Sequence, residues 1–303
     1  MPQSSYFTGP LYTRMAEDLH LGGMSERTHD GYLRAVRKLA DFCQTSPDKI
    51  AEDQLRRFFL HMKNDLNYAY GTLRVAFSGI KFFYTRTCRR DWQTLRQMKL
   101  QNIKSLPEVI TRCQVLQIVG AANTQRMAVY FWTVYSLGLR MQEGLNLQVG
   151  DLDGKRMMVH VHRGKGAKDR YVPLPTSTLQ ALRAYWKLHR HSYFLFPADG
   201  RKHTGISTAQ TAMSPTAVQS AIKKITKRLN FGKKISTHTL RHSYASHLLE
   251  AGVSLKAIQK FLGHSSLQTT MVYLHLTHTA ELDARKIVDN LFVRQPSHWP
   301  RRK

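Results

Sequence analysis

Residues 238–249 read His238-Thr-Leu-Arg241-His-Ser-Tyr-Ala-Ser-His-Leu-Leu, and residues 262–273 read Leu262-Gly-His264-Ser-Ser-Leu-Gln-Thr-Thr-Met-Val-Tyr273. His238 and Arg241 are three residues apart, so on a helix they project from one face toward the same group. Two cations earlier in the chain extend this polar set. In chain order, the candidate site residues are Arg140, Lys165, His238, Arg241, His264 and Tyr273.

This set contains what phosphoryl transfer to a side chain requires. Two guanidiniums can hold the charged oxygens of a phosphodiester in its transition state through forked hydrogen bonds. A tyrosine phenol, with an ordinary pKa of about 10, becomes a nucleophile when a base or a nearby charge helps it lose its proton. The histidines can give that help, and Lys165 can protonate a leaving 5′ oxygen. Taken alone, however, a His-x-x-Arg is more often a polar helix start, and most tyrosines belong to the core.

Two further stretches complete a family pattern. Residues 135–147 read Tyr-Ser-Leu-Gly-Leu-Arg-Met-Gln-Glu-Gly-Leu-Asn-Leu, and residues 163–174 read Arg-Gly-Lys-Gly-Ala-Lys-Asp-Arg-Tyr-Val-Pro-Leu. Together with the segments above, they closely resemble the tyrosine recombinases, also called phage-type integrases. The likeness covers about residues 106–292. A weaker likeness to the family's DNA-clamping amino-terminal domain covers about residues 10–90.

The resemblance implies both the fold class and the roles of the site residues. It implies a mainly α-helical protein with a small antiparallel β-sheet, in which a helical core-binding domain precedes a mixed α+β catalytic domain. It also implies Arg140 and Arg241 as phosphate ligands, His238 and His264 as members of the site, and Tyr273 as the nucleophile.

Glu143 is expected to support the site without reacting. It stands three residues past Arg140 and, on a continuing helix, shares its face. It can brace that arginine by hydrogen bonding. The alternative is an acid that simply faces solvent.

The composition favours a polyanionic partner. A formal charge of +26 and an isoelectric point of about 10.3 exceed what solubility needs, and nucleic acid answers such a charge through attraction and counterion release. Composition alone also permits a basic ribosomal or membrane-surface protein. Cys43, Cys88 and Cys113 suggest neither a disulfide framework nor a zinc knuckle. With no signal region and no apolar stretch long enough for a bilayer, we expect a soluble, cytoplasmic, nucleoid-associated protein.

The first part of the chain is predicted to be helical. Ser25 is a plausible N-cap for a helix over residues 26–43, where apolar side chains recur at helical spacing. Further helices are expected over about 52–63 and 70–86. Basic residues on these helices can lie along a phosphate backbone or can merely be solvated. The candidates for DNA contact are Arg34, Arg37, Lys38, Arg74 and Lys81.

Four segments are expected along the chain. A helical DNA-binding domain occupies residues 1–90, and a linker follows over 91–105, where apolar periodicity weakens and basic residues alternate with polar ones. The catalytic domain spans 106–292, and a basic tail occupies 293–303. An apolar helix near the end of the catalytic domain, over about 280–292, is expected to dock on a neighbouring subunit.

Within the catalytic domain, a β-hairpin is predicted from two short runs rich in β-branched and aromatic residues, at 157–162 and 170–174. Its glycine-bearing turn carries Lys165. A helix is predicted to begin at Pro215 after the N-cap Ser214. Basic residues of that helix can line a DNA groove or help solubility, and they are Lys223, Lys224 and Lys227.

No metal and no cofactor are expected. His238 and His242 have the i, i+4 spacing of zinc ligands, but His247 would point away from their shared face, and no HExxH pattern is present. Under the resemblance, His242 and His247 are packing or surface residues. The Gly-Lys-Gly around Lys165 lacks the arrangement of a nucleotide-binding loop.

The function implied is site-specific DNA recombination through a 3′-phosphotyrosine intermediate, for integration or excision of a mobile element. The resemblance also implies a C-shaped clamp of two domains around double-stranded DNA, a homotetramer joining two DNA sites, and possible accessory DNA-bending proteins. Alternatives are the Xer-like resolution of chromosome or plasmid multimers, relaxation of supercoils by a type IB topoisomerase-like enzyme, and a non-catalytic DNA-binding regulator.

Overall fold

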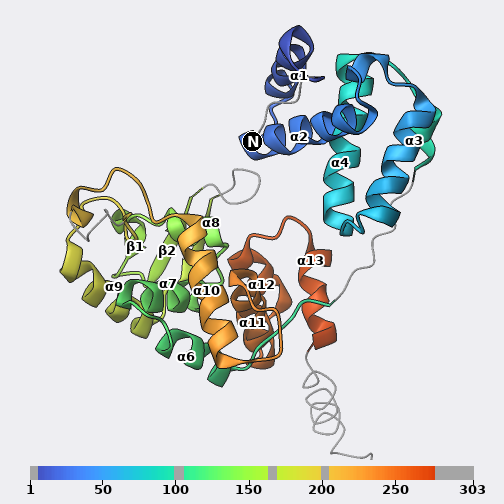
Figure 1. The fold of residues 1–303 in the computed structure, drawn as a ribbon. Helices are drawn as coiled ribbons and strands as arrows, with labels where there is room; N and C mark the ends of the chain where they lie inside the picture. The colour runs from blue at the N-terminus through green and yellow to red at the C-terminus, as the bar shows by residue number, and fades with distance from the viewer. Residues whose placement is uncertain (1–5, 99–105, 163–168, 199–204, 277–303) are drawn as a thin grey trace, which may run out of the picture. The chain divides into compact units, whose positions relative to one another are not determined.

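The computed structural model describes residues 6–98, 106–162, 169–198 and 205–276, and the chain divides into two compact units (Figure 1). The first unit comprises Met1–Lys104 and the second comprises Ser105–Lys303. Helices dominate both units, and the second also contains a three-stranded antiparallel sheet. The predicted fold class is therefore confirmed.

The described part of the first unit is helical throughout. Its elements are α1 (Gly9–Leu21), α2 (Glu26–Cys43), η1 (Pro47–Lys49), α3 (Glu52–Leu60), η2 (His61–Asp65), α4 (Tyr70–Phe82), η3 (Phe83–Thr87) and α5 (Gln93–Gln97). The helix predicted over residues 26–43 is confirmed as α2. The other two predicted helices each end in a π-helical turn, η2 and η3. Helix α1 was not predicted.

Helix α2 is fixed at its start and along one face. Ser25 Oγ accepts a hydrogen bond from the amide of Thr28 at 3.4 Å, which satisfies a free N–H of the first turn. Val36 is fully buried against the core, and α2 packs on α4. The two helices meet closely because Gly79 has no side chain: a Cβ there would lie 2.8 Å from the Cα of Tyr32.

The second unit has a helical body and a small sheet. Its helices are α6 (Arg112–Gly120), α7 (Gln125–Ser136), α8 (Met141–Leu145), α9 (Thr176–His189), α10 (Pro215–Leu229), α11 (Thr237–Glu250), α12 (Leu255–Leu262) and α13 (Leu267–Met271). Its strands and short helical turns are η4 (Val149–Asp151), β1 (Leu152–Asp153), β2 (Met158–Val161), β3 (Arg170–Pro173), η5 (Ile206–Thr208) and η6 (Val272–Leu276).

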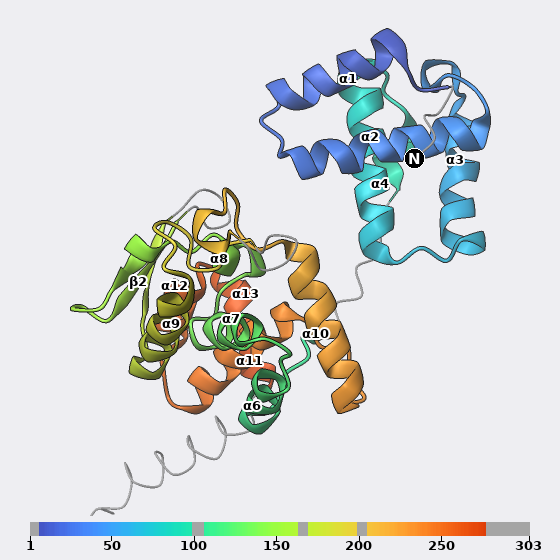
Figure 2. The same cartoon turned by 60° about the vertical axis from the view of Figure 1, so that its left-hand side comes forward.

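Helix α7 lies at the centre of the second unit (Figure 2). It packs against α6, α9 and α11, and Phe131 and Val134 on it are fully buried. Helix α6 begins with the capping box predicted by the sequence, in which Thr111 and Gln114 each accept a hydrogen bond from the other's backbone amide. No helix in the described parts of the chain is long and apolar enough to cross a membrane.

The sheet has the order β1-β2-β3 with antiparallel pairing. The predicted hairpin is confirmed as β2 and β3, with Val159 paired to Val172. Side chains alternate between faces along a strand, and on β3 the inward positions are Arg170 and Val172 while Tyr171 is exposed. An arginine therefore occupies a position where the pattern would place an apolar residue.

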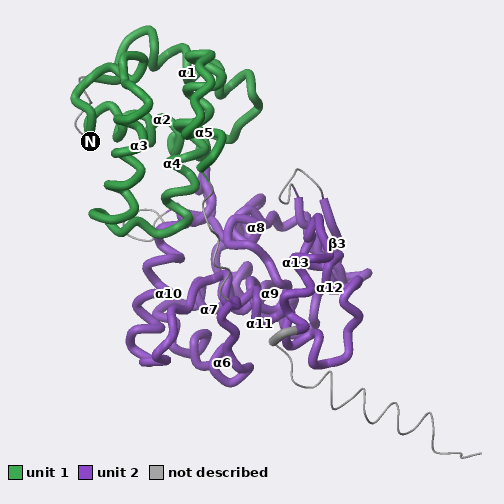
Figure 3. Tube along the Cα trace, turned by 90° about the vertical axis from the view of Figure 1, so that its right-hand side faces the viewer, with its two compact units in different colours: residues 1–104 green, residues 105–303 purple. Residues whose placement is uncertain are grey.

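The short helix α5 belongs to the first unit (Figure 3). It lies within residues 91–105, for which the sequence predicted a linker. Leu95 is buried in the core of that unit, and Trp92 packs against Tyr84 with ring centroids 4.1 Å apart and ring planes tilted by 32°. The amide of Thr94 also donates to Glu52 Oε1 at 2.5 Å. Packing of one leucine and one tryptophan thus attaches the start of this segment to the helical core.

We expect Gly138→Ala to lower the free energy of unfolding by about 2 kcal/mol or more. Gly138 follows α7 with a φ of +59°, and a Cβ there would lie 2.4 Å from the ring of Tyr244. Gly120→Ala is the matched control, because a Cβ on Gly120, the last residue of α6, meets nothing within 4 Å. Thermal and denaturant unfolding of both variants would test this, and equal stability of the two would contradict it.

Candidate active site

Helix α11 positions two of the predicted site residues. Ser236 caps it by accepting a hydrogen bond from the amide of Thr239 at 3.4 Å, so His238 and Arg241 lie in its first turns. Arg241 is only 3% exposed. Its guanidinium donates to the carbonyl of Gly138 at 2.7 Å and to that of Leu262 at 2.6 Å. Arg241 therefore joins the loop after α7 to the end of α12.

Glu143 receives hydrogen bonds from two further arginines. Arg140 is the N-cap residue of α8, and its backbone amide and guanidinium both donate to Glu143, at 2.8 and 2.7 Å. Arg170 reaches the same carboxylate from β3 through two nitrogens, at 3.0 and 2.7 Å. Arg241 Nη1 lies 3.5 Å from Glu143 Oε2. The side chain expected to brace Arg140 is thus a buried carboxylate shared by three guanidiniums.

The C-terminal end of α12 receives the same three arginines. The carbonyls of residues 261, 262 and 263 accept, respectively, from Arg170 at 2.7 Å, from Arg241 at 2.6 Å and from Arg140 at 3.5 Å. The last carbonyls of a helix have no partner within the helix and carry partial negative charge. Gly263 ends α12 in the left-handed conformation. The arginines therefore lie between a carboxylate and a helix end.

The charges in this group change the pKa values of Glu143 and Arg241. Burial alone would raise the pKa of Glu143, but hydrogen bonding and charge from Arg170, with further contributions from Arg140 and Arg241, lower it to about 2. Burial and the nearby Arg140 lower the pKa of Arg241 to about 9, which leaves its guanidinium charged at neutral pH. Glu143 and Arg241 are therefore both ionised at neutral pH in the folded protein.

The phenol of Tyr273 faces a histidine. Tyr273 lies in η6 and is 1% exposed, packed in a cluster with Ile258 and Leu262. Its Oη lies 2.8 Å from Nδ1 of His242. The ring of His264 lies nearly parallel to that of Tyr273, at 15° and with centroids 6.4 Å apart.

The imidazoles around the phenol are neutral at physiological pH. Burial first, and then the nearby cations, lower the pKa of His242 and of His264 to about 4. Partial desolvation, Arg241 and Arg140 also lower the pKa of His238. Burial raises the pKa of Tyr273, against the opposing effect of Arg241 and Arg140. In the neutral tautomer that carries its proton on Nε2, Nδ1 of His242 accepts the hydrogen bond and the phenol donates it.

Five of the six predicted catalytic residues lie in this one region. The carbonyl and ring contacts above connect four of them, Arg140, Arg241, His264 and Tyr273. His238 lies close enough to both arginines for their charges to lower its pKa. The sixth, Lys165, lies outside the described residues.

Sequence analysis missed two residues of this site. His242 contacts the phenol directly, whereas it was assigned to packing or the surface; its i, i+4 spacing from His238 was the signal that could have found it. Arg170 was not singled out, although its alternation with Val172 on β3 places it on the inward face. By contrast, His247 is buried against the hydroxyl of Tyr135 at 2.8 Å, as a packing residue.

The candidate DNA-contact residues of the first unit have different surroundings. Arg34 and Arg74 line one groove between α2 and α4. The other three contact aromatic side chains: Arg37 lies over Tyr12 at 6.0 Å, Lys38 lies over Tyr68 at 4.9 Å, and Lys81 lies over Phe77 at 5.8 Å.

In the second unit, a basic groove runs beside the start of α11. Lys223 and Lys227 of α10 line it together with Lys233, Lys234 and His238. Lys224 is exposed on the same helix, outside the lining of this groove. The groove places four ammonium groups next to a predicted site histidine.

The chain matches known proteins over both units. Residues 108–280 match the phage integrase family, and residues 11–94 match the phage integrase N-terminal SAM-like domain. The chain is 34% identical over 268 residues to the putative integrase/recombinase y4qK of Sinorhizobium fredii, covering 88% of this chain and 84% of that protein. It is 36% identical over 280 residues to a tyrosine recombinase of Thermosipho africanus, covering 88% and 95%.

Solved structures share the fold. A variant of the Tn1549 transposon integrase in complex with transposon right end DNA aligns with a TM-score of 0.69 at 18% identity, covering 92% of this chain and 99% of that one. The XerA recombinase aligns with a TM-score of 0.51 at 23% identity, covering 94% and 99%.

The chain belongs to the phage integrase family. It is a tyrosine-type site-specific DNA recombinase, and the family expected from the sequence is confirmed.

We expect Glu143→Gln to lower the free energy of unfolding at pH 7 by about 3 kcal/mol, because it leaves buried guanidiniums without their counter-charge. The pKa of Glu143 is depressed in the fold, so its contribution is present above about pH 4.5 and is lost as the pH falls toward about 2. The stability gap between wild type and variant should therefore narrow on acidification. Glu108→Gln is the control, since Glu108 pairs with Lys233 in solvent at 3.4 Å. A gap that is constant between pH 7 and pH 3 would contradict this account.

Proposed function

We propose that this recombinase breaks and rejoins DNA through a covalent link to Tyr273. The phenol oxygen attacks a backbone phosphorus, a 3′-phosphotyrosine forms, and a 5′ hydroxyl leaves. A 5′ hydroxyl of the partner duplex then displaces the tyrosine. One phosphoester replaces another of similar energy at each step, so the exchange needs no ATP. The contact between the Tyr273 phenol and the neutral imidazole of His242, beside Arg140 and Arg241, carries this proposal.

The arginines supply charge for the transition state. Arg140 is 23% exposed at its side chain, so a phosphate can reach it, whereas Arg241 lies deeper and donates to two carbonyls. Both stabilise the negative oxygens of the reacting phosphate, and the loss of one such contact costs about 3 to 4 kcal/mol of transition-state stabilisation. His238 and His264 bind the phosphate and assist proton movement, and Lys165 protonates the departing 5′ oxygen.

His242 is the proton acceptor for the nucleophile in this mechanism. The phenol proton passes to Nδ1 as the bond from the tyrosine oxygen to phosphorus forms. A resting imidazole with a pKa of about 4 is a weak base, which keeps the phenol protonated without DNA. The negative charge of a bound phosphodiester stabilises the imidazolium and so favours transfer.

The biological task we propose is integration or excision of a mobile element, by a homotetramer on two DNA sites in the cytoplasm at the nucleoid. The relatives named integrase/recombinase and the fold shared with a transposon integrase on its DNA support this role. The alternative is multimer resolution, supported by 33% identity over 263 residues to the tyrosine recombinase XerA of Thermococcus onnurineus. Docking of residues 280–292 in trans, and accessory DNA-bending proteins, remain part of the proposal; those residues lie outside the described ones. The roles of Arg34, Arg74, Lys223 and Lys227 as DNA contacts rest on the two grooves.

A DNA duplex nicked beside the cleavage point should trap wild-type protein covalently, because the short released strand diffuses away before religation. Tyr273→Phe should bind the same DNA and trap nothing, since it lacks the attacking oxygen. Tyr193→Phe, at an exposed tyrosine, is the control and should trap as wild type does. Denaturing gel electrophoresis and mass spectrometry of the adduct read the result. An adduct on another residue, or trapping by Tyr273→Phe, would overturn the proposed mechanism.

We expect His242→Gln to slow single-turnover cleavage by at least about 100-fold at pH 7, as the loss of a general base does. Higher pH should restore part of the rate, because solvent then removes the phenol proton. His247→Gln, at the histidine bonded to Tyr135, is the matched control and should retain most of the rate. If His242→Gln cleaves at the wild-type rate across the pH range, His242 is not the proton acceptor.

A further inference from the structure

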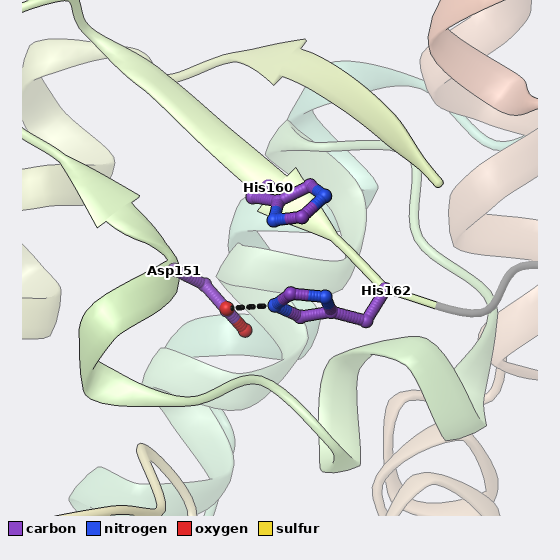
Figure 4. Close-up of side chains that lie close together, drawn as sticks. All are labelled: Asp151, His160 and His162. Atoms are coloured by element: carbon purple, nitrogen blue, oxygen red, sulfur yellow. Dashed lines mark hydrogen bonds and ion pairs between the residues drawn. The ribbon is translucent and has the colours of Figure 1, made fainter. Parts of the chain in front are cut away.

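A second cluster of polar side chains lies at the sheet, separate from Tyr273. His160 lies in β2, His162 follows the last residue of that strand, and Asp151 approaches both from η4 (Figure 4). One donor atom from each of these three residues lies within 4.8 Å of the others. Neither the proposed recombination chemistry nor the DNA grooves use this cluster.

Hydrogen bonds hold the buried Asp151 in place, while the two histidine side chains are partly exposed to solvent. His162 Nε2 donates to Asp151 Oδ1 at 2.5 Å, and Asp151 Oδ2 accepts from the amide of Gln148 at 2.9 Å. Asp169 Oδ2 lies 3.3 Å from His160 Nε2 and 3.8 Å from His162 Nδ1. The Asp151 side chain is 4% exposed, while those of His160 and His162 are 26% and 40% exposed. A small ion can therefore enter from solvent onto a fixed carboxylate.

We propose that Asp151, His160 and His162 bind a divalent transition-metal ion, with Zn²⁺ as the best match, and that Asp169 supplies a fourth ligand. Imidazole nitrogen and carboxylate oxygen are ligands that Zn²⁺ takes in tetrahedral sites, where neighbouring donors are about 3.3 Å apart. His160 Nε2 and Asp169 Oδ2 lie 3.3 Å apart, which matches that spacing. The two carboxylates neutralise the charge of the ion, and the Gln148 amide holds Asp151 in place as an outer-shell partner does.

The two rings lie close enough to bind one ion together. The ring centroids of His160 and His162 are 3.9 Å apart. Tyr171 stacks on His160 at 4.7 Å and fixes its plane.

The bound ion would fasten the two ends of the segment that carries Lys165. His162 directly precedes residues 163–168, and Asp169 directly follows them. Ligands on both sides would hold the end of β2 and the start of β3 together. The metal thus serves the structure of the hairpin and requires no step in the strand-exchange reaction, so binding can be tested without measuring recombination.

Calorimetric titration of the metal-free full chain with Zn²⁺ should give one ion per chain bound at this cluster, and Zn²⁺ should raise the midpoint of thermal unfolding. Co²⁺ should give the visible absorption of a tetrahedral site with nitrogen and oxygen ligands. His160→Ala/His162→Ala should weaken binding by more than about 100-fold, because even outer-shell partners change metal affinity by 10- to 100-fold. Asp151→Asn, which keeps an acceptor for Gln148, should weaken it while preserving the fold.

Two control variants locate the ion. His20→Ala/His29→Ala removes a pair of neighbouring histidines in the first unit, with ring centroids 6.4 Å apart, and should leave binding unchanged. His238→Ala/His242→Ala removes histidines near Tyr273 and should also leave it unchanged. Loss of binding in either control with retention in His160→Ala/His162→Ala would overturn the proposal, as would a wild-type chain that takes up no Zn²⁺ at micromolar concentration.

Discussion

Glu143 is the buried carboxylate that allows three guanidiniums to gather in the interior of the second unit. Arg140, Arg170 and Arg241 each lie within 3.5 Å of its carboxylate. Burying so many like charges without a counter-charge would cost several kcal/mol for each ion. Glu143 accepts hydrogen bonds from Arg140 and Arg170, and carbonyls at the C-terminal end of α12 accept further hydrogen bonds from the same group of arginines. The group of cations proposed to bind phosphate is consequently held in place by contacts within the fold itself.

The same contacts join segments that are distant in sequence. Arg140 follows α7, Arg170 begins β3, Arg241 lies in α11, and all three converge on consecutive carbonyls at the end of α12. Tyr273 lies in η6 and packs against α11 and α12, in the same hydrophobic cluster as Leu262. A shift of any one of these elements therefore alters the surroundings of Tyr273, the proposed nucleophile.

Much of this could be predicted from sequence because its signals are local. The N-cap at Ser25, the capping box at Thr111 and the alternation along the hairpin each depend on residues a few positions apart, and each matched the structure. Helix α1 was missed although Leu11, Met15 and Leu19 recur at helical spacing, because no side chain caps its start. Helix α5 was missed because one buried leucine gives no periodic pattern. The contacts of His242 and Arg170 could not be predicted from local pattern. His242 meets Tyr273 across 31 positions, and Arg170 meets Glu143 across 27, so both pairs form only after folding. Likewise, Asp151 and His162 are ordinary residues in sequence and become neighbours only through the turn between η4 and β2.

The burial of Tyr273 has a consequence for a DNA-cleaving enzyme that is always surrounded by DNA. At 1% exposure, with its hydroxyl committed to His242, the phenol offers no oxygen to a passing phosphate or to water-borne electrophiles. In the proposed reaction, bound DNA must therefore bring a phosphodiester to the phenol while the contact with His242, which receives the phenol proton, is kept. Enzyme without bound target DNA would then leave the chromosome uncut. Selectivity would begin with burial of the proposed nucleophile, before any base is read.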